Sequence, residues 1–517
     1  MNINRRGFIF GSTAAMTLAG CATNKVGLRS LKPGEKRTIA MIGCGTQMRK
    51  ALIPQFLGGD GGADASVREK IRIVAVCDCD RIRRESCKRQ VDAAYGDAAC
   101  RAVADFRDII ADPGIDAVCI ATPDHWHAYM CVEAMKHGKD VYCEKPLTFN
   151  VDEARKVIAA QEKYGRVFQT GSMQRSWDVF RTACMIVRNG CIGDVMYVDA
   201  NYGKGGAKAG GPSWPTRFFN NPENAAKEGA PNPNVDWDMW LGPAKWRPYS
   251  DELAPRDDKS SYPMFWRFDD DTGSGYNGDW GAHHLDIAQW GLDMDSSGPF
   301  RVIRSDEPHS TDLFHGGRRQ WGMRMLFRKP YGTVELYHGP FGVITGVGGW
   351  GTVFYGTKGI VAVNRGKIAV WEGTGLVKPT PEVRKGVEDA SFMKDRIVAE
   401  SIGKDYGTDA TVKADDRLER TLAKLKAHFR LDTAPVQLYR SPNQVQNFVE
   451  CIETRKPTVS PAEVGARGAV LCQLCNLSYV YDTGFDWDPE RMDFANGTGH
   501  GISLKRDFCR NGWETVV

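Results

Sequence analysis

Asp140-Val141-Tyr142-Cys143 is a short apolar run that leads directly into Glu144-Lys145-Pro146. The run predicts a buried strand, and the proline that follows Lys145 restricts the backbone of the lysine. Lys145 is therefore expected to be held in place at the end of a strand, at the point where a first domain gives way to a second.

Similar apolar runs alternate with helical patterns on both sides of this segment. Strands are expected over residues 37–42, 71–76, 116–121, 141–143 and 167–170, and helices over 48–57, 81–95, 106–111, 122–137 and 152–164. Continuous apolar strands that alternate with helices indicate a parallel sheet with both faces covered. The sequence therefore predicts an α/β Rossmann domain, a doubly wound parallel sheet, over residues 37–171.

The texture of the chain changes after about residue 172. Stretches rich in aromatic residues, glycine and proline separate further strands, which are expected over 194–200, 322–327, 333–337 and 359–363. This pattern predicts an α+β domain over residues 172–517, with a large, mostly antiparallel open sheet. A helix is expected over residues 441–454, with Ser441 as its N-cap and Pro442 at its first position.

A nucleotide site is indicated at the start of the first domain. Gly43-Cys44-Gly45 follows a strand and precedes a helix, which brings backbone N–H groups to a pyrophosphate, although Met48 stands where the third glycine of the fingerprint is usual. Asp78, at the end of the second strand, can accept both ribose hydroxyls of NAD and repels the extra phosphate of NADP. The insert over residues 58–65 accounts for the long spacing to Asp78, so the predicted cofactor is NAD.

The third strand ends at Thr122-Pro123, at the carboxyl edge of the sheet where ligands bind in such folds. Trp126 and His127 then either face the crevice or serve the fold, Trp126 in the core and His127 as a helix cap. The predicted cofactor-binding residues are Gly43, Gly45, Thr46, Gln47, Asp78, Thr122, Pro123, His125, Trp126, His127, Glu144, Lys145 and Gln174.

Several motifs occur in a fixed order along the chain. They are Gly43-x-Gly45, Val76-Cys77-Asp78, the run from Ala121 to His127, the run from Gly138 to Pro146, and Asp279-x-x-x-His283. Together they resemble the Gfo/Idh/MocA oxidoreductase family. The resemblance implies a Rossmann domain, a C-terminal open sheet often used for oligomerisation, and NAD(P)-dependent oxidation or reduction of sugars and cyclitols. A homodimer or homotetramer is expected.

The resemblance also assigns catalytic roles, in which Lys145 matches the active-site lysine, Asp279 the acid and His283 the histidine. A hydroxyl that loses hydride from its carbon must also lose a proton, which suits a histidine. Asp279 and His283 are four residues apart, so the acid is expected to orient or charge the imidazole from the same helix face, and Lys145 would polarise the oxygen. The alternative is that Asp279 caps a helix and His283 packs beneath it. His284 is expected to be structural.

Other features indicate packing rather than chemistry. Most of the aromatic residues over 237–243 and 265–268 are expected in the core. Asp269-Asp270-Asp271 lacks the ligand spacing of an EF-hand loop, and the cysteines lack zinc spacing, so no metal and few disulfides are expected. A net charge of +4 over 517 residues gives no sign of a nucleic-acid partner.

The N-terminus predicts export. Arg5-Arg6 is a twin-arginine pattern before an apolar run over residues 8–19 that is too short to span a bilayer. Leu18-Ala19-Gly20-Cys21 resembles a lipobox, which predicts a signal peptide over 1–20, a lipidated Cys21 and a tether over 21–36. A plain signal cut near Ala22 is the alternative. The protein is thus expected in the periplasm or on the cell surface, attached to the membrane through Cys21 only.

Three functions fit these features. The main hypothesis is an NAD-dependent oxidoreductase that acts on a hydroxyl of a sugar, cyclitol or glycoside and holds its cofactor tightly, because free NAD is scarce outside the cytoplasm. The alternative is an NAD-dependent glycoside hydrolase that works by transient oxidation and elimination; similar glycosidases tend to lack the lysine that stands here at 145. A non-catalytic sugar-binding lipoprotein is disfavoured by the presence of Lys145, Asp279 and His283.

Overall fold

The computed structural model describes residues 29–59, 63–201, 227–257, 265–275, 277–304, 323–338, 351–374, 396–401 and 416–517. The expected signal peptide, the lipobox cysteine and the first part of the tether lie outside the described residues. Within these ranges, no helix combines the length and the apolar character needed to cross a bilayer.

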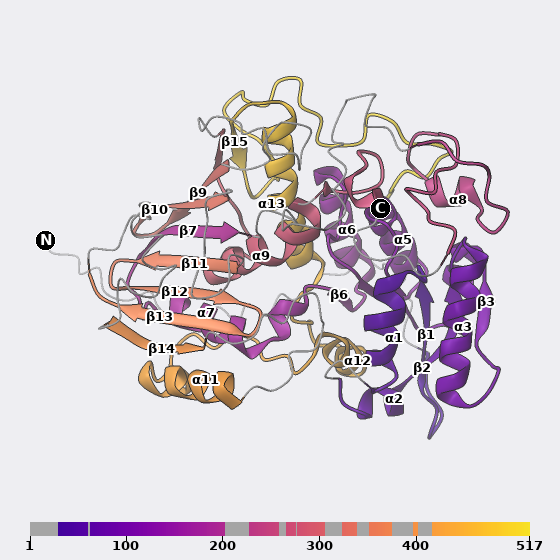
Figure 1. The fold of residues 1–517 in the computed structure, drawn as a ribbon, viewed down its shortest axis with the longest axis horizontal. Helices are drawn as coiled ribbons and strands as arrows, with labels where there is room; N and C mark the ends of the chain where they lie inside the picture. The colour runs from indigo at the N-terminus through magenta and orange to yellow at the C-terminus, as the bar shows by residue number, and fades with distance from the viewer. Residues whose placement is uncertain are drawn as a thin grey trace, which may run out of the picture.

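The first sheet has six parallel strands in the order β3-β2-β1-β4-β5-β6 (Figure 1), which is the strand order of a Rossmann fold. The strands are β1 (Arg37–Ile42), β2 (Ile71–Cys77), β3 (Arg101–Val103), β4 (Ala117–Ile120), β5 (Asp140–Cys143) and β6 (Phe168–Thr170). The predicted doubly wound parallel sheet is confirmed. The edge strand β3 was not expected, because three residues with one exposed arginine carry no apolar pattern.

Helices cover both faces of this sheet, close to the predicted ranges. They are η1 (Met48–Leu52, π-helical), α1 (Ile53–Phe56), α2 (Ser66–Lys70), α3 (Arg81–Tyr95), α4 (Phe106–Ala111), α5 (Asp124–Lys136) and α6 (Val151–Tyr164). Asp80 caps α3 by accepting from the backbone N–H groups of Ile82 and Arg83. This cap fixes the start of α3 directly after the end of β2, beside Asp78.

A helix from the far end of the chain completes the first domain. Helix α12 (Gln444–Thr454) buries Phe448 in the same core as β1 and β2, where its ring meets Tyr142 edge-on at 5.9 Å. The predicted N-cap is wrong. Asn443 caps α12 and has an extended backbone, so the helix begins after it, whereas the Ser441 hydroxyl lies 2.8 Å from that of Ser176.

The second sheet has ten strands in the order β14-β13-β12-β11-β7-β10-β9-β8-β15-β16. Every neighbouring pair is antiparallel except β7 with β10, so the predicted mostly antiparallel sheet is confirmed. The strands are β7 (Val195–Asn201), β8 (Arg301–Ile303), β9 (Met323–Lys329), β10 (Gly332–His338), β11 (Gly351–Gly356), β12 (Gly359–Asn364), β13 (Lys367–Glu372), β14 (Ile397–Ser401), β15 (Phe485–Asp488) and β16 (Asp493–Phe494).

Helices α7 (Asp178–Arg188) and α9 (Ala282–Gly291) lie on the second sheet, and α13 (Ala462–Val480) reaches from α9 to β6 of the first sheet. Helix α7 packs on β12 and α9 packs on β11 and β7, whereas α13 contacts both α9 and the Rossmann helix α6. In Figure 1 α9 and α13 lie between the ten-stranded sheet and the first domain. The face of the second sheet that α9 covers therefore looks toward the carboxyl ends of the Rossmann strands.

Candidate active site

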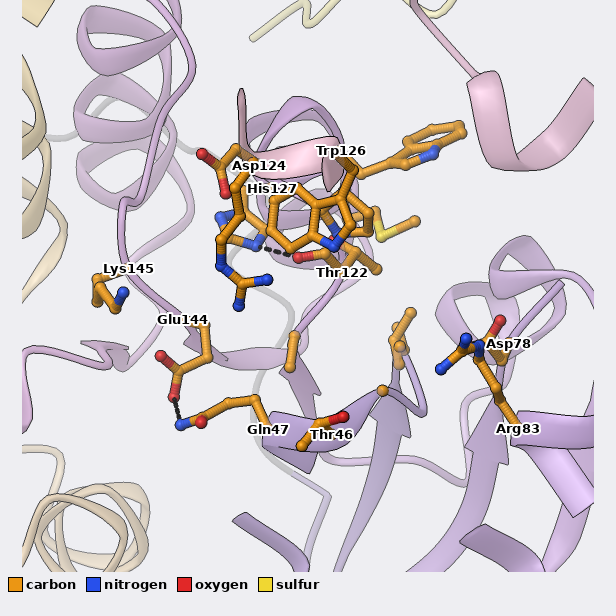
Figure 2. Close-up of a pocket in the computed structure, with 18 of the residues that line it drawn as sticks. Thr46, Gln47, Asp78, Arg83, Thr122, Asp124, Trp126, His127, Glu144 and Lys145 are labelled. Atoms are coloured by element: carbon orange, nitrogen blue, oxygen red, sulfur yellow. Dashed lines mark hydrogen bonds between the residues drawn. The ribbon is translucent and has the colours of Figure 1, made fainter. Parts of the chain in front are cut away.

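A cavity of about 490 Å³ lies at the carboxyl ends of β1 and β4, where the strand order of the first sheet reverses. This is the place where ligands bind in open α/β sheets, and the volume is in the usual range for small-molecule sites. Figure 2 shows Asp78 at one end of the cavity, Lys145 at the other, and Thr46 and Gln47 between them.

The turn after β1 is shaped for a close backbone approach. Gly43 has φ of 87°, and a Cβ atom there would come within 2.7 Å of the backbone of Ala121 at the end of β4. Only glycine therefore lets the two loops meet at the reversal point. Gly45 lines the cavity, and a Cβ there would meet no protein atom within 4 Å, which leaves room beside the backbone for a ligand.

Asp78 faces the cavity and also supports this turn. Its carboxylate accepts from the backbone N–H of Cys44 at 2.7 Å and from that of Asp80 at 2.8 Å. Burial raises the pKa of Asp78, and these backbone hydrogen bonds oppose that shift. A carboxylate offers about four acceptor positions, so Asp78 can still accept from hydroxyl groups of a ligand.

Arg83 lies beside Asp78 and was not singled out from the sequence (Figure 2). Its Nε atom is 3.2 Å from the Asp80 carboxylate, and its Nη2 atom donates to the backbone carbonyls of Pro255 and Asp257 at 2.9 and 3.0 Å. These contacts commit the guanidinium to protein groups, so it is poorly placed to serve a ribose phosphate.

The segment over residues 227–257, hereafter the cover segment, closes the crevice from the side of the second domain. The backbone N–H of Arg81 donates to the Asn234 carbonyl at 2.8 Å, and that of Asp236 donates to the Cys79 carbonyl at 3.1 Å. Four residues of the segment line the cavity, namely Met239, Trp240, Leu253 and Ala254. A ligand at the Asp78 end would thus be enclosed by both domains.

Helix α5 contributes only part of its predicted residues to the cavity. Trp126 both lines the wall and packs edge-on against Phe106 at 5.2 Å, whereas the His127 ring nitrogens lie 2.8 Å from the Pro146 carbonyl and 3.0 Å from that of Thr122. Both residues therefore face the crevice and serve the fold. The alternative that His127 caps the helix is wrong, because α5 begins after Pro123 without a side-chain cap hydrogen bond.

His125 and Gln174 are not among the residues of the cavity wall. The ring of His125 lies 3.1 Å from the carbonyls of Thr272 and Trp240, because successive helical residues point in different directions and His125 looks away from the crevice. Burial lowers the pKa of His125 to about 3. Gln174 is buried in the short helix η2 (Met173–Ser176), whose neighbour Met173 lines the wall instead.

Glu144 and Lys145 enter the cavity together from the end of β5. Glu144 accepts from Gln47 Nε2 at 3.1 Å, and burial raises the pKa of its carboxyl group. The Lys145 ammonium donates to the backbone carbonyl of Asp279 at 2.7 Å and to its carboxylate at 2.9 Å. Lys145 is thus held in place, as the sequence predicts, and the residue that holds it, Asp279, belongs to the second domain.

Asp279 lies in a π-helical turn, η5 (Asn277–Gly281), directly before α9. Its carboxylate pairs with Lys145 and lies 3.4 Å from Arg267 Nε. The expected pairing of Asp279 with the His283 ring is not what the structure shows, since His283 Nδ1 has no hydrogen-bond partner among the described residues. The wider π turn moves Asp279 off the position that a regular i, i+4 spacing gives.

His283 is buried in the cavity wall, on the first turn of α9. Burial, followed by the positive charges of Arg365 and Lys145, lowers its pKa well below the usual value. The imidazole is therefore neutral at physiological pH and can accept a proton. His284 stacks on Trp280 at 6.2 Å and does not line the cavity, which agrees with a structural role.

Arg365 is a second wall residue that sequence reasoning missed. It forms, with Gly366, the two-residue turn between β12 and β13, and its guanidinium lies 4.7 Å from the centre of the Trp280 ring. A charged residue in a hairpin turn normally faces solvent, so the sequence carries no signal for it. Here only 4 % of Arg365 is exposed, because the hairpin points at the site.

The remaining expectations concern aromatic and acidic side chains. Trp240 and Trp266 line the cavity, and Trp237 stacks on Trp240 at 4.8 Å. The carboxylates of Asp269 and Asp271 both form ion pairs with Arg247. Among the described residues, no cluster of His, Cys, Asp and Glu could hold a metal ion, and the fourteen described cysteines are free thiols.

Comparisons with known proteins match both domains. Residues 37–172 match the family model described as "Oxidoreductase family, NAD-binding Rossmann fold", and residues 186–320 match that described as "Oxidoreductase family, C-terminal alpha/beta domain". The two matched regions together make up more than half of the 517 residues.

Among individual proteins, the inositol 2-dehydrogenase of Rhodococcus jostii is 32% identical over 142 residues, which is 27% of this chain and 37% of that protein. A glycosyl hydrolase family 109 protein of Shewanella pealeana is 26% identical over 220 residues, 39% of this chain and 46% of that protein. The matched segments span less than half of the length of these relatives. The crystal structure of an aldose-aldose oxidoreductase from Caulobacter crescentus gives a TM-score of 0.49 at 16% identity, over 87% of this chain and all of that one.

The position of Asp78 predicts a preference for NAD over NADP. Asp78→Asn removes the negative charge and one of the two oxygens that accept backbone N–H groups, so the hydrogen bond from Cys44 or from Asp80 is lost and the other is kept. NAD binding should weaken by about tenfold, as expected when a hydrogen bond to a charged group is lost, and discrimination against NADP should relax. Calorimetric titration of both dinucleotides measures this, with Asp97→Asn on the exposed side of the domain as control. A native protein that prefers NADP would contradict the role of Asp78.

Proposed function

Since the chain belongs to the Gfo/Idh/MocA oxidoreductase family, we propose that it is an NAD-dependent oxidoreductase that acts on a hydroxyl group of a sugar, cyclitol or glycoside. The observation that carries the proposal is that Lys145 and His283 line the same cavity. Lys145 lies at the end opposite Asp78 (Figure 2), and its charge contributes to the lowered pKa of His283. A hydrogen-bond donor and a neutral base at one point suit the oxidation of an alcohol.

The residues present fit NAD. Gly43 lets the turn after β1 approach the end of β4, Gly45 leaves the backbone open to a pyrophosphate, and Asp78 offers further acceptor positions to ribose hydroxyls. When bound, NAD supplies an acceptor for hydride. Glu144 and Lys145 lie at the other end of the cavity, where the reactive part of an extended dinucleotide belongs.

The protein groups would then divide the work on the hydroxyl. Lys145, with its ammonium group fixed by Asp279, would donate a hydrogen bond to the substrate oxygen and stabilise negative charge on it. His283 would take the hydroxyl proton in oxidation and return it in reduction. Asp279 positions Lys145 and balances part of its charge, rather than orienting His283.

The cover segment supports a cofactor that stays bound. Its backbone hydrogen bonds to Arg81 and Cys79, and the contacts of Arg83 with Pro255 and Asp257, would have to break before a dinucleotide could leave. A retained cofactor must be regenerated in place. That requires either a second sugar as hydride acceptor or a redox-neutral reaction on one sugar.

A second candidate is an NAD-dependent glycoside hydrolase. The similarity to a glycosyl hydrolase family 109 protein favours it, and a retained cofactor suits a reaction without net oxidation. Oxidation of a hydroxyl makes the neighbouring C–H acidic, so the aglycone can be eliminated before water is added. Lys145, which similar glycosidases tend to lack, favours the oxidoreductase.

A panel of free sugars, cyclitols and aryl glycosides separates the two functions. The purified protein should carry NAD through gel filtration and give NADH absorbance, or reduce a second sugar, when a substrate is oxidised. Release of aglycone without NADH or reduced sugar would support the glycoside hydrolase instead. Absence of both reactions from a protein that binds NAD would contradict the oxidoreductase.

Loss of the proposed base should affect turnover more than binding. His283→Gln should lower kcat by roughly 10²–10⁴-fold, the usual worth of general acid–base catalysis, and leave NAD binding intact. Lys145→Met should also lower kcat, and it should weaken cofactor binding because Lys145 adjoins Glu144. Steady-state kinetics and dinucleotide titration measure both effects, with exposed His428→Gln as control. If folded His283→Gln turned over at the wild-type rate, His283 would not be the base, and only its packing role would remain.

We also propose that the protein is exported by the twin-arginine route and anchored through lipidated Cys21, since Arg5-Arg6 and the lipobox-like sequence support both steps. Cys21→Ala should move the protein from the membrane fraction to the soluble fraction. Arg5→Lys with Arg6→Lys should keep it in the cytoplasm. Cys21→Ala that still sediments with membranes would contradict the anchor. Assembly as a homodimer or homotetramer stays a prediction.

A further inference from the structure

Two loops meet at the proposed site, and helix α13 bonds to both of them. The lysine loop (residues 144–150) follows β5 and carries Lys145, and the acid loop (residues 272–275 and 277–281) leads into α9 and carries Asp279. Gln473 and Asn476 lie three residues apart on α13, so their side chains share one face of the helix. Neither of these two side chains lines the cavity.

Gln473 holds the lysine loop. Its Nε2 atom donates to the Thr148 carbonyl at 2.8 Å and to the Thr148 hydroxyl at 3.1 Å. Both side chains are buried, so water does not compete for these hydrogen bonds. Thr148 lies three residues after Lys145, and the bonds from Gln473 therefore fix the loop that places the lysine.

Asn476 holds the acid loop at two points. Its Oδ1 atom accepts from Asn277 Nδ2 at 2.7 Å, and its Nδ2 atom donates to the Ser274 carbonyl at 2.9 Å. One contact needs an acceptor and the other a donor, which an amide supplies and a carboxylate or an apolar side chain does not. Asn277 begins the π-helical turn that contains Asp279, so Asn476 fixes the start of that turn.

The contact between the two loops needs both of them in place. The Lys145 ammonium donates to the carbonyl and to the carboxylate of Asp279, and it is carried on a long side chain with several rotatable bonds. Within a rigid helix, Gln473 and Asn476 are about 4.5 Å apart along the axis, at a rise of 1.5 Å per residue. That fixed spacing sets how far one loop can shift along the other.

We propose that Gln473 and Asn476 are positioning residues, through which α13 keeps the two loops in register and so holds the Lys145 ammonium against Asp279. This inference rests on the proposed function and assigns further residues to the same site. Neither amide would touch the substrate. Each would act through the contact between Lys145 and Asp279.

The reactivity of the Lys145 amine tests this inference directly. Gln473→Met and Asn476→Leu keep the size of each side chain and remove its hydrogen bonds. The purified proteins are labelled with acetic anhydride, and mass spectrometry compares acetylation of Lys145 with that of the exposed Lys505. An amine that is no longer held by two hydrogen bonds should be acetylated several-fold faster in both variants than in the wild type.

A matched control comes from the same helix. The Ser478 hydroxyl donates to the Thr483 carbonyl at 2.7 Å, away from both loops, so Ser478→Ala removes a hydrogen bond of α13 without freeing either loop. Its Lys145 should be acetylated at the wild-type rate. Asn476→Asp, which keeps an acceptor for Asn277 but cannot donate to Ser274, should lie between the wild type and Asn476→Leu and is the milder variant should the latter fail to fold.

Turnover should follow the labelling. Because a displacement of about 1 Å can cost about 10²-fold in rate, kcat should fall by about 10- to 100-fold in Gln473→Met and in Asn476→Leu. Binding of NAD should be unchanged. Either substitution displaces the same contact, so the double variant should lose little more kcat than the more affected single variant, whereas the losses of unfolding free energy should add.

The outcomes separate this inference from the proposed function. Acetylation of Lys145 at the rate of Ser478→Ala in both loop variants would overturn the inference. If acetylation rises in the variants but the wild type oxidises no sugar or cyclitol, the inference stands and the proposed function fails. If the wild type oxidises a sugar and both variants keep its kcat, the proposed function stands and the inference fails.

Discussion

The hydrogen bonds from the Lys145 ammonium to Asp279, at 2.7 and 2.9 Å, join the two domains at the point where the chemistry is proposed. Lys145 is placed by β5 of the Rossmann sheet, whereas Asp279 is placed by the turn before α9, which packs on the ten-stranded sheet. Neither domain alone therefore fixes the ammonium group. Helix α13 contacts both α6 of the first domain and α9 of the second, and so fixes the position of the two domains relative to each other. A helix outside the cavity wall thus helps to set the geometry of the site.

The same joining of domains encloses the nucleotide end. The cover segment meets the Rossmann domain mainly through backbone groups, and Trp126 Nε1 adds a bond to the Trp240 carbonyl at 3.2 Å. From the C-terminus, Arg510 Nη2 donates to the Asp238 carbonyl at 2.8 Å and holds the segment from its outer side. Opening the crevice thus requires several hydrogen bonds to break together. A ligand at the Asp78 end is thus enclosed by groups from both domains.

Local signals account for what the sequence could predict. Apolar strands, glycine turns and the Asp78 position depend on neighbours in the chain, and the Rossmann sheet and the placement of Lys145 follow from them. The role of Asp279 was misjudged because an i, i+4 spacing assumes a regular helix, whereas the chain makes a π turn at Asn277–Gly281. Arg83 and Arg365 were missed because their partners lie far away in sequence, at Pro255 and at Trp280. Long-range burial, rather than residue type, gives both arginines their positions.

The charges around His283 limit how it can act as a base. Accepting a proton makes the imidazole cationic close to Arg365 and Lys145, which is why its pKa is low in the free protein. A general base works best when its pKa is near the working pH, so a strongly lowered pKa makes His283 a weak base. Removal of either positive charge would raise the pKa of His283 and strengthen the base.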